Sequence, residues 1–116
     1  MTTVYQQGKR REYAVRDHLL ALGWTHVMTA AGSKGPADLV MVHPQHGLAL
    51  VQVGAPGKDI GPASRLALTA LADLCSALPL VATPIPRHGI RYRVVTRTPA
   101  QSWPAFDPVH GMDPRR

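Results

Sequence analysis

AAGSKGPADLVMVHPQHGLALVQV, residues 30–53, is the stretch that decides the fold. It opens with a glycine- and proline-containing turn at 30–36, and two almost continuous apolar runs follow at 37–43 and 48–53. Runs of Val and Leu of this length predict strands that are buried on both faces. The four residues between them, PQHG, have the composition of a tight turn, so the stretch predicts a hairpin.

Each apolar run carries one polar side chain, Asp38 near the start of the first and Gln52 near the end of the second. A buried carboxylate is unfavourable by several kcal/mol unless it is paired or binds a metal. The plain interpretation of Asp38 is a turn residue whose carboxylate accepts hydrogen bonds from backbone N–H groups. Gln52 has no turn to cap, so its amide needs a partner in the sheet or in a ligand. A hairpin can bring these two positions side by side.

A helix is predicted on each side of this hairpin along the chain. Before it, Val15, Leu19 and Leu22 recur at helical spacing and predict a helix over 9–22. After it, an apolar stripe predicts a helix over 63–78 and places its cysteine in the core. The members of this second stripe are Ala67, Leu68, Leu71, Leu74, Cys75 and Leu78.

Short β-rich runs predict three more strands, at 24–29, 80–83 and 90–96. The element order is then helix, three strands, helix, two strands. Neighbouring strands early in the chain and a helical connection later predict an α/β fold, with a mixed sheet of about five strands flanked by helices.

The segment at 99–116 holds four prolines and has little periodicity, which predicts an irregular tail that packs through Trp103 and Phe106. The preceding residues, 1–98, are expected to form one domain with a single hydrophobic core.

The composition narrows the classes of function. The chain has 116 residues, 45% of them apolar, and a formal charge of +6, which indicates a polyanionic partner or merely a basic surface. A single cysteine excludes an internal disulfide and fits a reducing compartment. No apolar run reaches the roughly 18 residues of a membrane span, and the polar N-terminus lacks a signal-peptide core. We therefore expect a cytoplasmic protein without a membrane partner.

A third polar residue, Glu12 in the first helix, can approach the point where Asp38 and Gln52 meet. The plain alternative is an exposed ion pair between Glu12 and Arg16, one turn further along the helix. Two carboxylates and an amide oxygen around one point form a site for a hard cation such as magnesium or manganese. A hard cation beside a basic surface suggests phosphodiester hydrolysis.

Three segments together resemble the archaeal Holliday junction resolvases of the PD-(D/E)XK nuclease superfamily. They are GKRREYAVRDHLLALGW at 8–24, VMTAAGSKGPADLVMV at 27–42 and LALVQVGAPGK at 48–58. The resemblance spans roughly residues 8–96 in element order. It implies a restriction-endonuclease-like fold, a homodimer, and Mg²⁺- or Mn²⁺-dependent cleavage of branched DNA.

The resemblance also implies roles for individual residues. The family's helix glutamate, turn serine, strand aspartate and E-x-K glutamate fall on Glu12, Ser33, Asp38 and Gln52. Magnesium would be held by Glu12, Asp38, Gln52 and the Val53 carbonyl. The family's lysine falls on Gly54, and Lys58 or Lys34 would have to reach in; we take Lys58 as the catalytic cation. The residues expected to contact DNA phosphates are Lys9, Arg10, Arg11, Lys34, Lys58 and Arg65.

Two departures from the family pattern keep three functions open. Gln52 removes one negative charge from the metal site, and Gly54 removes the cation that would stabilise the developing phosphorane charge. The leading hypothesis is a structure-selective endonuclease acting on branched DNA. The first alternative is a catalytically impaired, dimeric junction-binding protein, and the second is a restriction- or repair-type nuclease acting on linear duplex. For Ser33 and the loop lysines, ordinary turn and solvated roles stay open as well.

Overall fold

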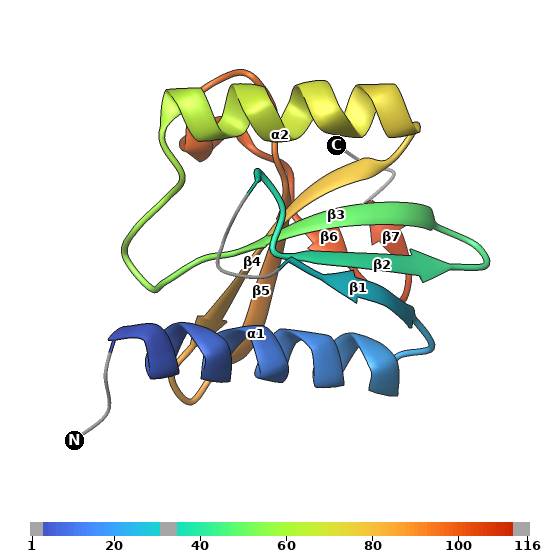
Figure 1. The fold of residues 1–116 in the computed structure, drawn as a ribbon, viewed down its shortest axis with the longest axis vertical. Helices are drawn as coiled ribbons and strands as arrows, with labels where there is room; N and C mark the ends of the chain where they lie inside the picture. Colours follow the sequence, from blue (N-terminus) through green and yellow to red (C-terminus); the bar gives the residue numbers. More distant parts are fainter. Residues whose placement is uncertain (1–3, 31–34, 113–116) are drawn as a thin grey trace.

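The computed structural model describes residues 4–30 and 35–112, which form a sheet with one long helix on each face (Figure 1). The elements are α1 (Val4–Ala21), β1 (Thr25–Thr29), β2 (Leu39–His43), β3 (Gly47–Val53), α2 (Pro62–Cys75), β4 (Leu78–Ile85), β5 (Gly89–Val94), β6 (Phe106–Asp107) and β7 (Gly111–Met112). A 3₁₀ turn at Ala100–Ser102 precedes β6. Neither long helix is long and apolar enough to cross a membrane, among the residues described.

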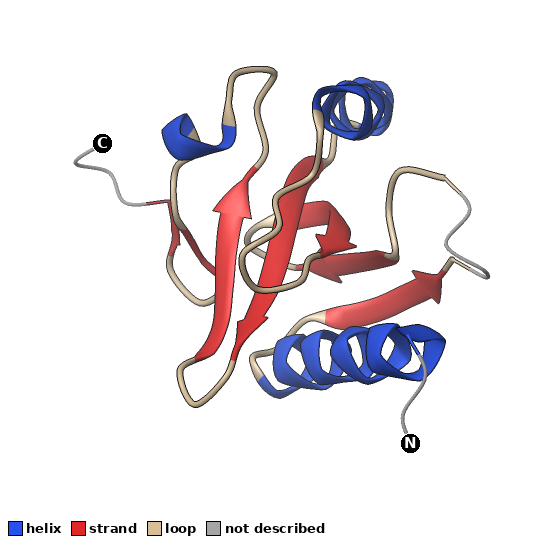
Figure 2. Cartoon of the chain, turned by 90° about the vertical axis from the view of Figure 1, so that its left-hand side faces the viewer, coloured by secondary structure: helices blue, strands red, loops and turns tan. Residues whose placement is uncertain are grey.

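The main sheet has five strands in the order β1-β2-β3-β4-β5, which confirms the predicted mixed α/β sheet. The pairs β1/β2, β2/β3 and β4/β5 are antiparallel, whereas β3 and β4 are parallel. A parallel pair needs a crossover, and α2 supplies it. Figure 2 shows the same layers from the side, with the strands between the two long helices.

The predicted hairpin is present and fixes the register around the polar residues. Leu39 pairs with Val51, and the ladder ends at His43 and Gly47, where Gly47 takes a φ of +77° in the turn. Continuing this register by one residue brings Asp38 level with Gln52. The Asp38 backbone N–H donates to the Val51 carbonyl over 2.9 Å, so the chain is still tied to β3 at that point.

Side chains alternate between two cores, one on each face of the sheet. On the face toward α1, Val15 and Leu19 are fully buried against residues such as Val51. On the other face, Leu68 of α2 packs against residues that include Leu50. Burying each Leu or Val of this kind contributes about 1.5–3 kcal/mol. The alternate residues of β2 are only half-buried, so this strand is not buried on both faces as predicted.

Two predicted helices differ in detail from the observed ones. The first begins at Val4 rather than at residue 9, among the residues described. The second ends at Cys75, because Ser76 adopts a left-handed conformation (φ 53°) that caps it. Its buried positions are Leu68, Thr69 and Ala72, and Leu71 packs against the same core, so the predicted stripe is confirmed at Leu68 and Leu71. It is wrong at Leu74, which is 84% exposed, and at Cys75, which is exposed. An Ala- and Leu-rich helix has apolar residues on several faces, and periodicity alone did not select the buried one.

The C-terminal segment is more regular than predicted. Trp103 and Phe106 are buried, as expected, each in one of the two cores. The short strands β6 and β7 pair with each other, and the Trp24 indole N–H donates to the Pro108 carbonyl over 2.9 Å. The segment therefore covers part of the core instead of forming an irregular tail.

Candidate active site

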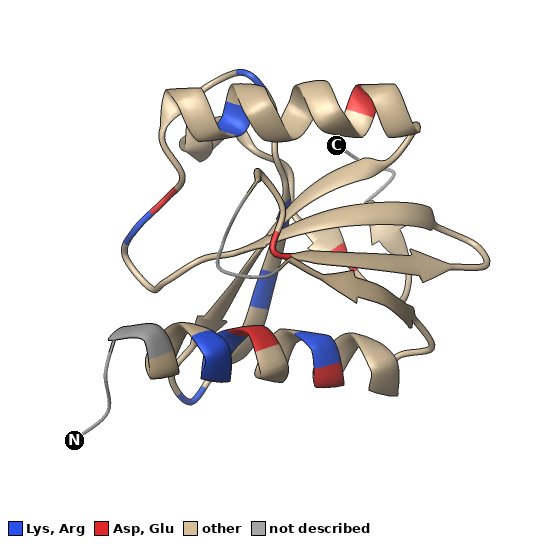
Figure 3. Ribbon diagram, in the orientation of Figure 1, with Lys and Arg blue, Asp and Glu red and all other residues tan. Residues whose placement is uncertain are grey.

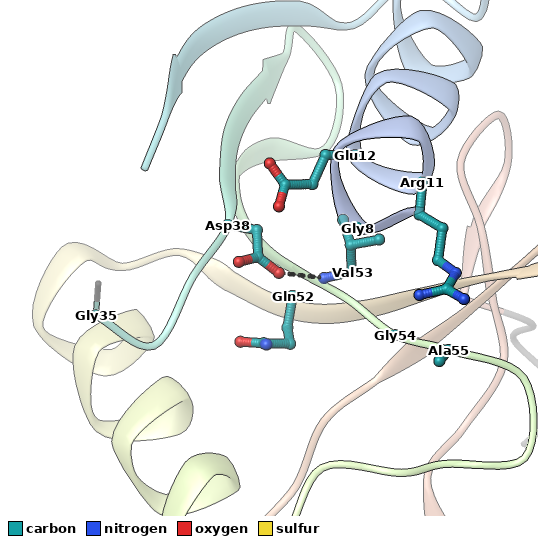
Figure 4. Close-up of a pocket in the computed structure, with 9 residues that line it drawn as sticks. All are labelled: Gly8, Arg11, Glu12, Gly35, Asp38, Gln52, Val53, Gly54 and Ala55. Atoms are coloured by element: carbon teal, nitrogen blue, oxygen red, sulfur yellow. Dashed lines mark hydrogen bonds between the residues drawn. The ribbon is translucent and has the colours of Figure 1, made fainter. Parts of the chain in front are cut away.

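A pocket of about 220 Å³ opens between α1 and the C-terminal end of β3 (Figure 4). The structure brings Glu12, Asp38 and Gln52 together in this pocket, although they come from a helix and two strands. Its lining residues are Gly8, Arg11, Glu12, Gly35, Asp38, Gln52, Val53, Gly54 and Ala55.

Asp38 lies one residue before β2 and is 7% exposed. Its Oδ2 accepts a hydrogen bond from the Val53 N–H over 2.8 Å, which ties the carboxylate to the neighbouring strand and not to its own turn. Burial raises the pKa of Asp38, while this hydrogen bond and the charge of Lys9 oppose the rise. The hairpin thus holds the carboxylate in one orientation at the edge of the sheet.

Glu12 is 8% exposed on the sheet-facing side of α1, so the alternative of an exposed ion pair with Arg16 is wrong. Arg16 instead pairs with Asp17, with Nη2 and Oδ1 3.0 Å apart. The Glu12 Oε1 has no hydrogen-bond partner within the described part of the chain, and the Lys9 Nζ lies 3.6 Å from it. Burial raises the pKa of Glu12, the negative charge of Asp38 raises it further, and Lys9 lowers it.

The third predicted ligand, Gln52, is half-buried and completes the oxygen donors of the pocket. In Figure 4 the Asp38 carboxylate lies between the Glu12 carboxylate and the Gln52 amide. Within the described ranges, no group of three or more His, Cys, Asp or Glu side chains is placed to hold a metal. An ion would therefore have two carboxylates, with the Gln52 amide oxygen or the Val53 carbonyl as further ligands.

These donors fit a hard divalent cation. A cation would stabilise these two buried carboxylates, since the negative charge of Asp38 raises the pKa of Glu12 and the Glu12 Oε1 accepts no hydrogen bond within the described part of the chain. All the available donors are oxygens, which suits Mg²⁺ or Mn²⁺ with water in the remaining positions.

Gly54 stands where the family pattern has a lysine. A Cβ added there would lie 3.1 Å from the Thr83 Oγ1, so the Thr83 side chain would have to give by a few tenths of an ångström. Arg11, from α1, lines the same pocket, and Figure 4 shows its guanidinium extending toward Gly54 and Ala55. Sequence reasoning assigned Arg11 only to DNA contact. Its position directly before Glu12 was the available signal for a role in this pocket.

The remaining predicted residues are placed as follows. Ser33 and Lys34 lie outside the described residues. Lys58 does not line the pocket of Glu12 and Asp38 but lines a neighbouring one. Figure 3 shows basic residues on α1, in the loop between β3 and α2, and on α2 and β5. The predicted DNA contacts Arg10 and Arg65 belong to α1 and α2, respectively.

Comparison with known proteins identifies the fold. No family model matches the chain, and no curated protein matches it. Among solved structures, the chain is similar to Hjc, a Holliday junction resolvase from the archaeal hyperthermophile Archaeoglobus fulgidus. The TM-score is 0.67 with 21% identity, over 80% of this chain and 79% of that chain. At this identity the likeness shows a shared fold, and it agrees with the resemblance found in the sequence.

Proposed function

We propose that this protein is a metal-dependent, structure-selective endonuclease that hydrolyses phosphodiesters in branched DNA, like the resolvase whose fold it shares. The observation that carries the proposal is the buried pair of Glu12 and Asp38. The helix α1 and the hairpin bring the two carboxylates together in a pocket that the basic side chain of Arg11 also lines. A pair of buried acids without a full set of partners is typical of a functional site.

Glu12, Asp38, Gln52 and the Val53 carbonyl would hold Mg²⁺ or Mn²⁺. When bound, such an ion polarises the phosphate and lowers the pKa of a coordinated water. The protein's own contribution is orientation. The Val53 N–H holds the Asp38 carboxylate, and α1 holds Glu12 at a fixed distance from the sheet. Ser33, which lies outside the described residues, keeps the place in the catalytic centre that the family resemblance implies.

Arg11 is the residue that we assign to the phosphate. Figure 4 shows its guanidinium extending toward Gly54, where the family pattern places a lysine. A guanidinium can donate two hydrogen bonds to a phosphate and stabilise the negative charge that develops during in-line attack. Lys9 stands 3.6 Å from Glu12 and lowers its pKa, which keeps that carboxylate available as a ligand.

The DNA arms would lie along the basic residues of α1, of the loop after β3 and of α2. Backbone contacts of this kind position a duplex without reading its sequence. They also make the affinity strongly dependent on salt, since each phosphate contact releases counterions. The proposed contacts are Lys9, Arg10, Arg11, Lys34, Lys58 and Arg65.

A homodimer follows from the substrate, because a two-fold junction needs two symmetric cuts. The exposed side of α2 is the apolar surface that fits a second copy of the chain. Leu66 is 51% exposed and Leu74 is 84% exposed, and Cys75 lies beside the latter. Side chains of this type on a helix face are typical of a subunit interface.

One specific observation favours the alternative of a junction-binding protein without cleavage activity. The neutral Gln52 weakens the metal site, and Gly54 supplies no cation at the family's lysine position, where an added Cβ would lie 3.1 Å from the Thr83 Oγ1. The basic surface and the dimer would be retained in that case.

The test is cleavage of a synthetic four-way junction in Mg²⁺ or Mn²⁺, with a linear duplex of the same sequence in parallel. We expect cleavage of the junction by the native protein and loss of cleavage with retained binding in Asp38→Asn and Glu12→Gln. Asp17→Asn, an exposed acid on the same helix, is the matched control and should cut normally. Binding without cleavage by the native protein would select the binding function. Equal cleavage of both substrates would select the linear-duplex nuclease, and cleavage that survives Asp38→Asn would remove the proposed site.

A further inference from the structure

A second pocket, of about 150 Å³, lies next to the candidate active site and shares Ala55 with it as a wall. Its lining combines the loop after β3 with the paired strands β4 and β5. The lining residues are Ala55, Gly57, Lys58, Asp59, Thr83, Ile85, Arg91 and Arg93. Three basic side chains against one acidic side chain give this pocket an excess of positive charge, so its ligand is expected to be an anion.

The two pockets adjoin at Ala55, and polar residues of one sheet face lie between them. Gln52 and Gly54 alternate with Val53, so both lie on the face toward α2, where the added Cβ of Gly54 meets Thr83. Thr83 pairs directly with Arg91 across β4 and β5. A polar track therefore leads from Gln52 past Thr83 to the arginines of β5.

Two buried side chains of the second pocket have polar atoms without a partner. Arg93 is 7% exposed and Thr83 is 5% exposed. Neither the Arg93 Nε nor the Thr83 Oγ1 has a hydrogen-bond partner among the described residues. Each such group is unfavourable when buried alone, and an anion that accepts hydrogen bonds would satisfy both.

The rest of the arrangement holds Arg93 in place. Its Nη2 pairs with the Asp59 carboxylate, and its guanidinium carbon lies 5.2 Å from the centre of the Trp103 ring. This ion pair neutralises Asp59, the only acid among the residues that line the pocket. It also anchors the loop that contains Lys58 against β5. Lys58 and Arg91 are exposed, so they stand at the entrance with their charges available.

We infer that this second pocket, with Thr83 and Arg93 inside and Lys58 and Arg91 at its entrance, binds a backbone phosphate of DNA close to the one that is cut. The inference rests on the proposed function. A strand that enters the first pocket carries its next phosphates at a rise of about 3.4 Å each, so an adjoining anion pocket receives one of them. Lys58 is then a phosphate contact of this second pocket and not the catalytic cation.

The experiment is a scan with neutral linkages. In a four-way junction, one phosphodiester at a time near the cleavage point is replaced by an uncharged methylphosphonate, and equilibrium binding is measured without divalent metal. We expect one linkage at which neutralisation weakens binding about fivefold to the native protein but has no effect with Arg91→Gln or Thr83→Val. Arg91→Gln should also lower the slope of log affinity against log salt by about 0.7–0.9, the value of one phosphate contact.

The matched control is Arg87→Asn. Arg87 lies in the turn between β4 and β5, does not line the pocket, and has a φ of 67° that asparagine tolerates. It should leave the sensitive linkage unchanged. Because Arg91 is exposed and Thr83→Val keeps the shape of the side chain, both variants are expected to fold, which thermal unfolding verifies.

The outcomes separate this inference from the proposed function. If the native protein cuts junctions but no linkage depends on Arg91 and Thr83, the phosphate pocket is refuted while the nuclease stands. A linkage that depends on them in a protein that never cuts supports the pocket and removes the nuclease. The last measurement is a titration with inorganic phosphate. If phosphate saturates the pocket and DNA does not displace it, DNA is not the source of the anion.

Discussion

Replacing Glu12 by glutamine should make the metal-free protein more stable at neutral pH. The variant replaces a buried negative charge beside the Asp38 carboxylate with a neutral amide of the same shape, and burying the charge is unfavourable by about 1–3 kcal/mol relative to the neutral group. The lost ion pair with Lys9, at 3.6 Å, offsets about 0.2–0.5 kcal/mol. The net gain is about 0.5–3 kcal/mol, or about 2–12 °C in Tm for a domain of this size.

The gain in stability of the Glu12→Gln variant should disappear at acidic pH. Burial and the charge of Asp38 raise the pKa of Glu12 in the folded state, so the folded protein binds this proton more tightly than the unfolded chain does. The stability of the native protein therefore falls as the pH rises from the ordinary glutamate pKa through the raised one. Below that range Glu12 is protonated in both states, and the two proteins should unfold at similar temperatures.

Manganese should reverse the order of stability. An ion that binds only the folded state adds about 2.7 kcal/mol at a hundred times its Kd, and Glu12→Gln weakens that binding. Thermal unfolding in EDTA and in Mn²⁺, at pH 4 and pH 7.5, gives the four values needed, with Asp17→Asn as the control. A variant that is less stable than the native protein in EDTA at pH 7.5 would refute the reasoning, and so would a gain that persists at pH 4.

Three further predictions test other parts of the site and the surface. Arg11→Gln should slow single-turnover cleavage by tenfold or more while junction affinity, measured by fluorescence anisotropy, falls less than threefold; equal losses would make Arg11 a binding residue only. Gln52→Glu should raise Mn²⁺ affinity about tenfold in calorimetry and lower the Tm in EDTA, because a third carboxylate joins Glu12 and Asp38; unchanged affinity would place Gln52 outside the metal site. Leu74→Glu should dissociate the dimer in light scattering without lowering the Tm of the subunit, since Leu74 is 84% exposed, whereas a dimer that survives the change would place the interface elsewhere.

The hairpin was predictable because its chemistry is local. The register of the hairpin is set by the apolar runs, by the turn residues and by the alternation of side chains between the two faces of a strand. This register brings Asp38 and Gln52 to the same level. The buried face of α2 was not predictable in this way. Thr69 is buried and Leu74 is exposed, since the docking of the helix on β3 and β4 selects the face and intrinsic apolarity does not.

The cations of the site show a different limit of sequence reasoning. The family pattern shows that Gly54 stands where a lysine is expected. It does not show which long side chain from another element lies near that position. Arg11, from α1, lines the same pocket as Gly54, and its guanidinium extends toward Gly54 in Figure 4. The arginines of β5 are a further indication in the sequence. Arg91 and Arg93 alternate with Tyr92 and Val94, which pack in the core on the α1 face, so both arginines lie on the face toward α2. A charged residue at a buried strand position needs a partner, and Asp59 supplies only part of what Arg93 can bind. The same physical rule that singled out Asp38 in its apolar run thus applies to Arg93, and both residues lie beside the same end of β3.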